Sequence, residues 1–292
     1  MTGLFFGAIL ISFSSVMVRL ADVPPDVVGF YRLFVGGLGM AVILWRMGRL
    51  SRMTGHIWLW GVLSALFFAG DFFFWHRSIG LVGPGLSTML GNFQVIILAA
   101  VSMFIFREGV SKPLLAAIFL ALVGLYLMVG VSWSQFTPEY RVGVVYGLLT
   151  ALFYALYLLS LKVSLNRAEA DPLAMACAVA LITGLLMGGL SVAKGESFVI
   201  PNLRSLAALA TLSLLCHAVG WYLITKGLQQ VRASLVGLIL LLQPSLSFVW
   251  DILFFGKPVN PVEISGVVLA LAAIYMGSMK SGKKGVRKLK KV

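Results

Sequence analysis

Charged residues are scarce in this sequence. Asp, Glu, Lys and Arg make up 11% of the 292 residues, whereas 60% are hydrophobic. Soluble domains carry about a quarter charged and about half apolar residues, so this composition excludes an ordinary water-soluble fold. A bilayer accommodates it, because spanning segments are helices or closed barrels that satisfy their own backbone polar groups. Unbroken apolar runs such as residues 114–131 favour helices, since barrel strands would alternate apolar with polar residues.

Cysteine is equally scarce. The only two, Cys177 and Cys216, fall inside apolar runs and form no CxxC pair, which excludes a disulfide framework and indicates buried core residues. No segment resembles a phosphate-binding P-loop, so ATP is not expected to supply energy. No second ligand accompanies His217 at a convincing spacing, so we expect neither a metal nor another cofactor.

The net charge of +13 does not indicate nucleic-acid binding. Many basic residues lie in the tail at 280–292, and the others mostly mark helix ends. A basic tail beside a membrane helix sets topology and contacts anionic lipid. With the N-terminus in the cytoplasm, basic residues concentrate on the inner side. We therefore predict cytoplasmic termini and an integral protein of a bacterial inner membrane.

Charges and turn residues divide the chain into segments of about 20 apolar residues, the length that spans a bilayer. The ten predicted spans are 3–20, 27–46, 56–77, 84–106, 112–131, 142–163, 172–193, 205–226, 233–255 and 260–279. The apolar run that starts at Leu4 has no basic segment before it, so we interpret it as a span and not as a cleaved signal peptide.

The two halves of the chain resemble each other. When residues 70–127 are laid without a gap over residues 219–276, Gln94 meets Gln243 and the helix breaks coincide. Each half has five predicted helices, an odd number, so the second half would cross the membrane inverted. We predict an all-α membrane fold of ten helices in two inverted five-helix repeats, followed by a tail. The predicted domains are residues 1–131, 141–279 and 280–292. Such repeats are typical of secondary transporters.

Residues 75–130 and 242–277 resemble the EamA-type repeat of the drug/metabolite transporter superfamily. That repeat tends to carry a proline inside its fourth helix, a glutamate just past that helix and a Gly/Ala-rich fifth helix. The resemblance implies export or exchange of small metabolites, amino acids among them. It also implies a central cavity lined by helices 1, 3, 4, 6, 8 and 9.

The two halves depart from that pattern in different ways. Pro244 has Val95 as its register partner in the first half, and Glu108 has Lys257 as its partner in the second half. The halves have therefore diverged, and a symmetric mechanism is not assumed.

Asp71 is the leading functional candidate, because a charge at membrane depth is costly and such residues tend to be functional. It could couple transport to protons or bind a substrate amine. The structural alternative is an ion pair, most simply with Arg32 in the second predicted helix.

Polar residues near the middle of other helices predict a central binding site. Asn92 and Gln94 lie in the fourth helix, and Gln243 lies in the ninth beside Pro244, which we expect to kink that helix. His217 in the eighth helix could relay protons or bind a carboxylate. The alternative for each is a hydrogen bond between helices.

An aromatic group could frame the same site. Thr150, Tyr154 and Tyr157 share one face of the sixth helix. Together with Trp75 and Trp221 they could form a pocket whose hydroxyl and N–H groups orient a ligand. Packing is the alternative, and Trp75 could instead be an interfacial anchor.

The leading hypothesis is a secondary transporter that alternates access around a midplane site and binds a small molecule as a monomer or a homodimer. An exchanger of phosphorylated or other anionic metabolites would need positive charge in the cavity, from Arg32, Lys162 or Lys226. An intramembrane enzyme would need clustered acid, base or metal groups. A non-transporting scaffold would tolerate the loss of Gln94 and Gln243 together.

Overall fold

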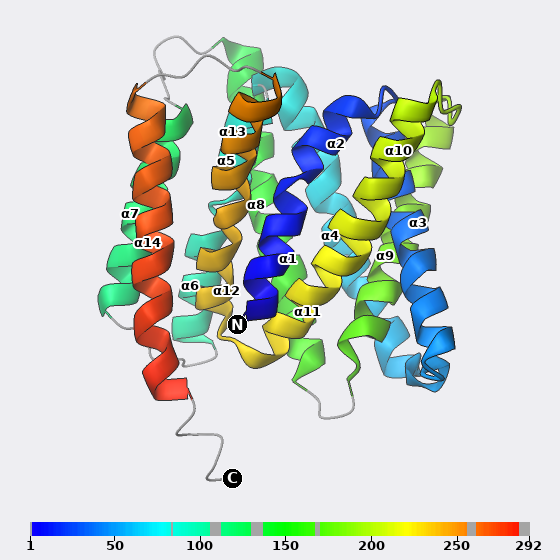
Figure 1. Ribbon diagram of the computed structural model, residues 1–292, viewed down its shortest axis with the longest axis horizontal. Helices are drawn as coiled ribbons and strands as arrows, with labels where there is room; N and C mark the ends of the chain where they lie inside the picture. Colours follow the sequence, from blue (N-terminus) through cyan, green and yellow to red (C-terminus); the bar gives the residue numbers. More distant parts are fainter. Residues whose placement is uncertain are drawn as a thin grey trace.

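The computed structural model describes residues 2–82, 84–105, 112–129, 137–166, 170–255 and 261–285, and the secondary structure in these ranges is helical. Figure 1 shows the helices running side by side, with the N-terminus and the C-terminal end of α14 towards the same side of the bundle. The helices are α1 Thr2–Ser12, α2 Ser14–Leu20, α3 Pro25–Arg46, α4 Gly55–Val82, α5 Pro84–Gly91, α6 Gln94–Phe104, α7 Lys112–Val129, α8 Pro138–Leu165, α9 Pro172–Ala193, α10 Leu203–Thr211, α11 Gly220–Gln230, α12 Ala233–Leu240, α13 Leu242–Phe255 and α14 Pro261–Gly285.

Apolar length makes this a membrane-helical fold. Within the described residues, 7 helices are long and apolar enough to cross a bilayer. Shorter apolar stretches lie in α7, at Leu115–Gly124, and in α14, at Ile264–Ala273. The described residues of the predicted spans are mostly helical, but that ten spans cross a membrane stays a prediction. Glu108, Lys257 and the tail beyond Gly285 lie outside the described residues.

Three predicted spans are interrupted near their centres. The first divides into α1 and α2 at Phe13. The fourth divides into α5 and α6 at Asn92 and Phe93, and the ninth into α12 and α13 at Leu241. Pro244 lies in the first turn of α13, where a missing N–H removes no bond within the helix. The interruption between α5 and α6 contains no proline. In a membrane such interruptions are tolerated where protein or a polar cavity surrounds the freed backbone groups.

The eighth predicted span changes its winding instead. A π-helical segment, Leu212–Val219, joins α10 to α11 and contains His217. Wider turns of this kind are rare and often occur at functional sites.

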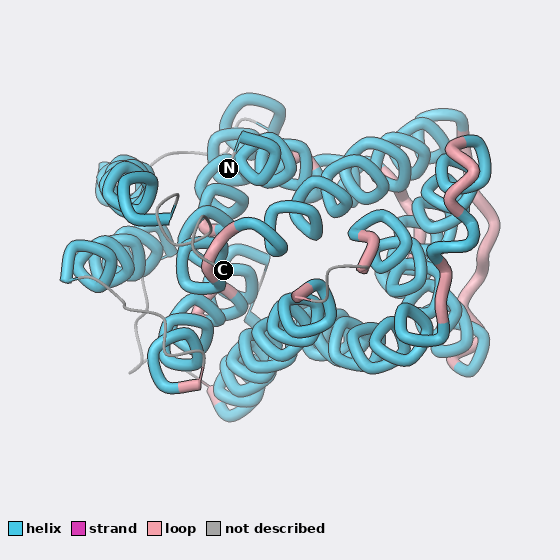
Figure 2. The backbone as a smooth tube through the Cα atoms, turned by 90° about the horizontal axis from the view of Figure 1, so that it is seen from below, coloured by secondary structure: helices cyan, strands magenta, loops and turns pink. Residues whose placement is uncertain are grey.

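Two pairs of helices lie at opposite ends of the bundle. α7 packs against α14 at one end and α3 against α9 at the other, and the end view in Figure 2 shows the helices between them. Small residues let α3 and α9 approach closely. A Cβ atom on Gly184 would lie 2.7 Å from the Phe34 backbone nitrogen, and one on Gly37 would lie 2.9 Å from the Leu181 side chain.

Ion pairs join α3 to α9 at both ends. Asp26 in the first turn of α3 pairs with Lys194, which follows α9. Asp171 caps the start of α9 and pairs with Arg49, which follows α3. Asp26 and Arg49 are separated by the same number of residues as Asp171 and Lys194. The two contacts are therefore reciprocal, with each acid near the start of one helix and its basic partner just beyond the end of the other.

Asp171 has two roles that two substitutions can separate. Its carboxylate accepts the backbone N–H groups of Leu173 at 2.9 Å and Ala174 at 3.4 Å, besides pairing with Arg49. Asp171→Asn keeps a cap and loses the charge, so we expect a small cost because Arg49 is partly exposed. Asp171→Ala also loses the cap and should cost about 1 kcal/mol more. Unfolding of the purified protein in detergent measures both, and equal costs would contradict the capping role.

Candidate functional site

A cavity of about 160 Å³ lies where the interrupted helices meet α4 and α8. Its walls come from segments far apart in the sequence: the α1–α2 region, α3, α4, α5 with the residue after it, α8, α11 and α13. The lining residues are Ile11, Ser14, Val18, Arg32, Phe68, Asp71, Phe72, Trp75, Thr88, Gly91, Asn92, Thr150, Tyr154, Trp221, Gln243, Pro244 and Ser247.

Most of the residues singled out in the sequence meet at this cavity. Asp71, Trp75, Asn92, Thr150, Tyr154, Trp221, Gln243 and Pro244 all line it. Three others, Gln94, Tyr157 and His217, lie outside the lining. That the lining residues bind a substrate stays a prediction.

Tyr157 and His217 form a second layer behind the aromatic wall. Tyr157 stacks on Phe68 with ring centroids 4.1 Å apart, and Phe68 itself lines the cavity. The His217 ring lies 6.3 Å from Trp221, and it packs closely against Gly36. Both residues therefore support cavity-lining side chains.

Gln94 begins α6 and is fully buried. Its amide oxygen lies close to Gly237 of α12, 3.4 Å from where a Cβ atom on that glycine would be. Neither its Oε1 nor its Nε2 has a hydrogen-bond partner among the described residues. This unsatisfied amide therefore lies where α6 contacts α12, and it is not part of the cavity wall.

Arg32 of α3 brings a positive charge to the cavity. The residue is 7% exposed, and its guanidinium forms no hydrogen bond or ion pair with any residue that the structure describes. Its nearest described aromatic contact is the ring of Phe72, whose centroid lies 5.7 Å from the guanidinium carbon. A buried charge without such partners is costly.

Asp71 brings a carboxyl group to the same cavity. The side chain is partly exposed, and within the described part of the chain it forms no ion pair, including with Arg32. The structural alternative considered for Asp71, pairing with Arg32, is therefore not realised. The cavity lining therefore contains one guanidinium and one carboxyl group, and these two groups form no ion pair with each other.

Other polar groups of the lining are also unsatisfied. Trp221 Nε1, Gln243 Nε2 and Ser14 Oγ have no hydrogen-bond partner among the described residues. By contrast, Asn92 Nδ2 donates to the Thr88 carbonyl at 2.7 Å, and Thr150 Oγ1 donates to the Tyr146 carbonyl at 3.0 Å. The unsatisfied groups are mostly donors, which suits a ligand rich in acceptor oxygens.

A family model describes almost the whole chain. The model of the EamA-like transporter family matches residues 1–130 and 141–279. The chain belongs to the EamA-like transporter family. Membership of this family confirms the resemblance that the repeats suggested.

Curated relatives of this EamA-like chain carry little functional detail. It is 27% identical over 174 residues to the "Uncharacterized inner membrane transporter YhbE" of Escherichia coli (strain K12) and to that of Shigella flexneri. The alignment covers 57% of this chain and 53% of each relative, so the chain spans about half the length of the curated relatives it matches.

A solved structure shares the fold of this EamA-like chain. A crystal structure superposes with a TM-score of 0.82 and covers 97% of both chains at 17% sequence identity. This likeness shows the fold alone.

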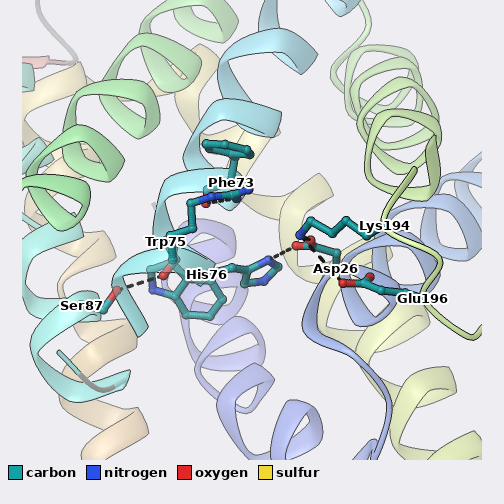
Figure 3. Close-up of polar contacts among 8 residues, drawn as sticks. Asp26, Phe73, Trp75, His76, Ser87, Lys194 and Glu196 are labelled. Atoms are coloured by element: carbon teal, nitrogen blue, oxygen red, sulfur yellow. Dashed lines mark hydrogen bonds and ion pairs between the residues drawn. The ribbon is translucent and has the colours of Figure 1, made fainter. Parts of the chain in front are cut away.

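The EamA-like chain also has a polar cluster beside the cavity that the sequence analysis did not identify (Figure 3). Asp26 accepts a contact from His76 Nδ1 at 2.7 Å and also pairs with Lys194. Glu196 lies 3.8 Å from Lys194. His76 follows the cavity-lining Trp75 in α4, so this cluster anchors the cavity wall to α3 and to the end of α9. In the sequence, the acid and the base that flank α3 are separated by the same number of residues as those that flank α9. This repeated spacing is the signal from which the ion pairs could have been predicted.

Replacing Asp26 tests this anchor. Asp26→Ala would leave His76 and Lys194 without their acceptor, and Lys194 is partly exposed, so water offsets part of the loss. We expect a cost of about 1–3 kcal/mol in unfolding free energy, measured in detergent. Asp22, exposed in the preceding loop, is the matched control, and Asp22→Ala should change stability little. Equal effects of the two substitutions would refute the anchoring role.

Proposed function

We propose that this protein is a secondary transporter that exports or exchanges small metabolites, with amino acids as the first candidates, by alternating access through the cavity. The observation that carries the proposal is a largely apolar cavity with several polar side chains, lined in part by residues at or beside the interruptions of the fourth and ninth predicted spans. Discontinuous helices around a midplane site are a recurrent construction in secondary transporters. Family membership supports transport, and the cavity supports the location of the site.

The proposal includes ten spans in two inverted repeats, with domains at 1–131 and 141–279. Three observations support it. The interruptions after Gly91 and after Leu240 occupy matching positions when the halves are aligned through Gln94 and Gln243. The ion pairs between α3 and α9 are reciprocal, as a two-fold axis would make them. The family model matches each half separately. Both termini would then be cytoplasmic, with the basic tail near anionic lipid and the unit a monomer or homodimer.

Exchange of anionic metabolites is less well supported. That function needs more than one cation at the cavity, and Arg32 is the cation among the described lining residues. The Lys162 ammonium donates to the carbonyls of Leu228 at 2.9 Å and Val231 at 2.6 Å, where it caps the end of α11. Lys226 is exposed and lies over the Tyr222 ring. An intramembrane enzyme is disfavoured because the cavity carries single charges and not an acid–base cluster.

Asp71 is the proposed coupling residue. It presents a carboxylate to the cavity at membrane depth, where such groups commonly relay protons. In proteoliposomes preloaded with a mixture of neutral amino acids, wild-type efflux should accelerate when a pH gradient is imposed. Asp71→Asn should remove this acceleration, whereas Asp22→Asn should keep it. Gradient dependence that survives in Asp71→Asn would rule out the coupling role.

Replacing Gln94 and Gln243 together distinguishes a transporter from a non-transporting scaffold. Gln243 lines the cavity and Gln94 lies where α6 contacts α12, so replacing both with leucine removes polar groups at the centre of the protein. We expect a fall in initial efflux rate of about tenfold or more, the effect of one or two lost polar contacts. A double variant that folds and transports at the wild-type rate would count against the site.

A further inference from the structure

Helices α3 and α9 come from different halves of the chain, yet they contact each other at both ends and in the middle. We propose that α3 and α9 move as one rigid unit during alternating access, held together by the two ion pairs at their ends. The moving parts of the transporter are then not its two repeats, because this unit takes one helix from each repeat. The inference rests on the proposed transport function and adds which helices move together.

Ion pairs close the two ends of this unit in the same structure. Asp26 at the start of α3 is 3% exposed and pairs with Lys194, and Asp171 at the start of α9 is 4% exposed and pairs with Arg49. Separating the helices at either end would take a cation away from a buried carboxylate, which is costly in a protein interior. Two helices that form a gate separate at one end and then at the other, so each cycle would break both of these contacts.

Between the ion pairs, the two helices approach each other at the level of the backbone. A Cβ atom on Gly184 would lie 2.7 Å from the Phe34 backbone nitrogen, and one on Gly37 would lie 3.0 Å from the Leu181 backbone nitrogen. The Cys177 thiol also donates to the Gly37 carbonyl at 3.5 Å. Close packing of small residues is a main source of helix association in a membrane, where lipid is as apolar as the helices. This interface therefore leaves no room for a solute between α3 and α9.

The interface between α3 and α9 is also separate from the cavity wall. Arg32 on α3 lines the cavity, but none of the described lining residues belongs to α9. A solute that enters or leaves the cavity therefore has no need to pass between these two helices. The opening has to occur elsewhere in the wall, for example between the helices that carry Val18 and Thr88.

A cross-link between α3 and α9 tests this inference. Phe30→Cys and Gly188→Cys are combined in a background in which the buried Cys177 and Cys216 are replaced by alanine. A Cβ atom on Gly188 would lie 2.7 Å from the Phe30 ring, so the two positions are adjacent, and both ion pairs stay in place. The new cysteines are oxidised to a disulfide, and efflux of a mixture of neutral amino acids from proteoliposomes is measured before and after oxidation.

The bridged protein should transport at the same rate as the same protein after reduction, because a rigid unit does not open at this interface. A gate would instead lose its efflux when the bridge forms and regain it on reduction. That second result would overturn the inference.

Arg49→Cys with Asp171→Cys tests the other end of the unit. A short bifunctional thiol reagent bridges this pair, because the ion-paired side chains are longer than cysteine. Each bridged sample is compared with its own reduced form, so the lost cap at Asp171 affects both forms equally. Equal efflux supports the inference, and efflux that stops on bridging overturns it. If this pair does not fold, the bridge between Phe30→Cys and Gly188→Cys decides alone, since a gate has to open at each end once in every cycle.

The matched control is a bridge across the cavity. Val18 on α2 and Thr88 on α5 both line it. Bridging Val18→Cys and Thr88→Cys with a reagent long enough to span the cavity should stop efflux, and reduction should restore it. Efflux that continues with this bridge in place would contradict transport through the cavity, and would leave the results on α3 and α9 as they stand.

A measurement without transport separates the inference from the proposed function. In a protein that carries both cysteine pairs of α3 and α9, one end is bridged first and the rate of bridging at the other end is then measured. A rigid unit should show the same rate with and without the first bridge. A gate closed at one end is open at the other, so its second bridge should form more slowly. Slower bridging would overturn the inference even in a protein that transports no amino acid, and an unchanged rate in such a protein would support the rigid unit while transport fails.

Discussion

Inside a membrane, a polar group without a hydrogen-bond partner has a high free-energy cost. This cost determines where the helices of this structure run and where they are interrupted. Lipid offers no hydrogen bonds, so the backbone must satisfy itself, and helices do so along most of the described chain. The interruptions between α1 and α2, between α5 and α6 and between α12 and α13 are the exceptions, and residues at or beside each of them line the cavity. The same cost makes Arg32 and Asp71 informative, since each is an ionisable group in the cavity lining that forms no ion pair with a described side chain.

Helix α3 carries Arg32 to the cavity and is held against α9. Close packing at Gly37 and Gly184 brings the helices together, and reciprocal ion pairs join their ends. Arg32 projects from α3 into the cavity, while His76 of α4 reaches Asp26 at the start of α3. The position of the buried guanidinium therefore depends on contacts that also join the two halves of the chain.

Much of this could be predicted from the sequence, and the reasons for the rest are physical. Apolar runs and breaks such as Pro24-Pro25 and Asp171-Pro172 locate the helices, because spanning length and backbone chemistry are local properties. Asn92 and Gln243 reach the cavity as their central positions indicate. Tyr157 and His217 do not, since the rotation of a helix and the side chains in front of it decide which residues reach a cavity. The contact between Asp26 and His76 joins distant segments, and single-helix patterns do not reveal it.

An experimental structure of the protein with a transported neutral amino acid bound would test the central claim most directly. The account predicts the ligand in the cavity, in contact with lining residues on both interrupted helices such as Asn92 and Gln243. A transported amino acid bound outside this cavity would contradict it.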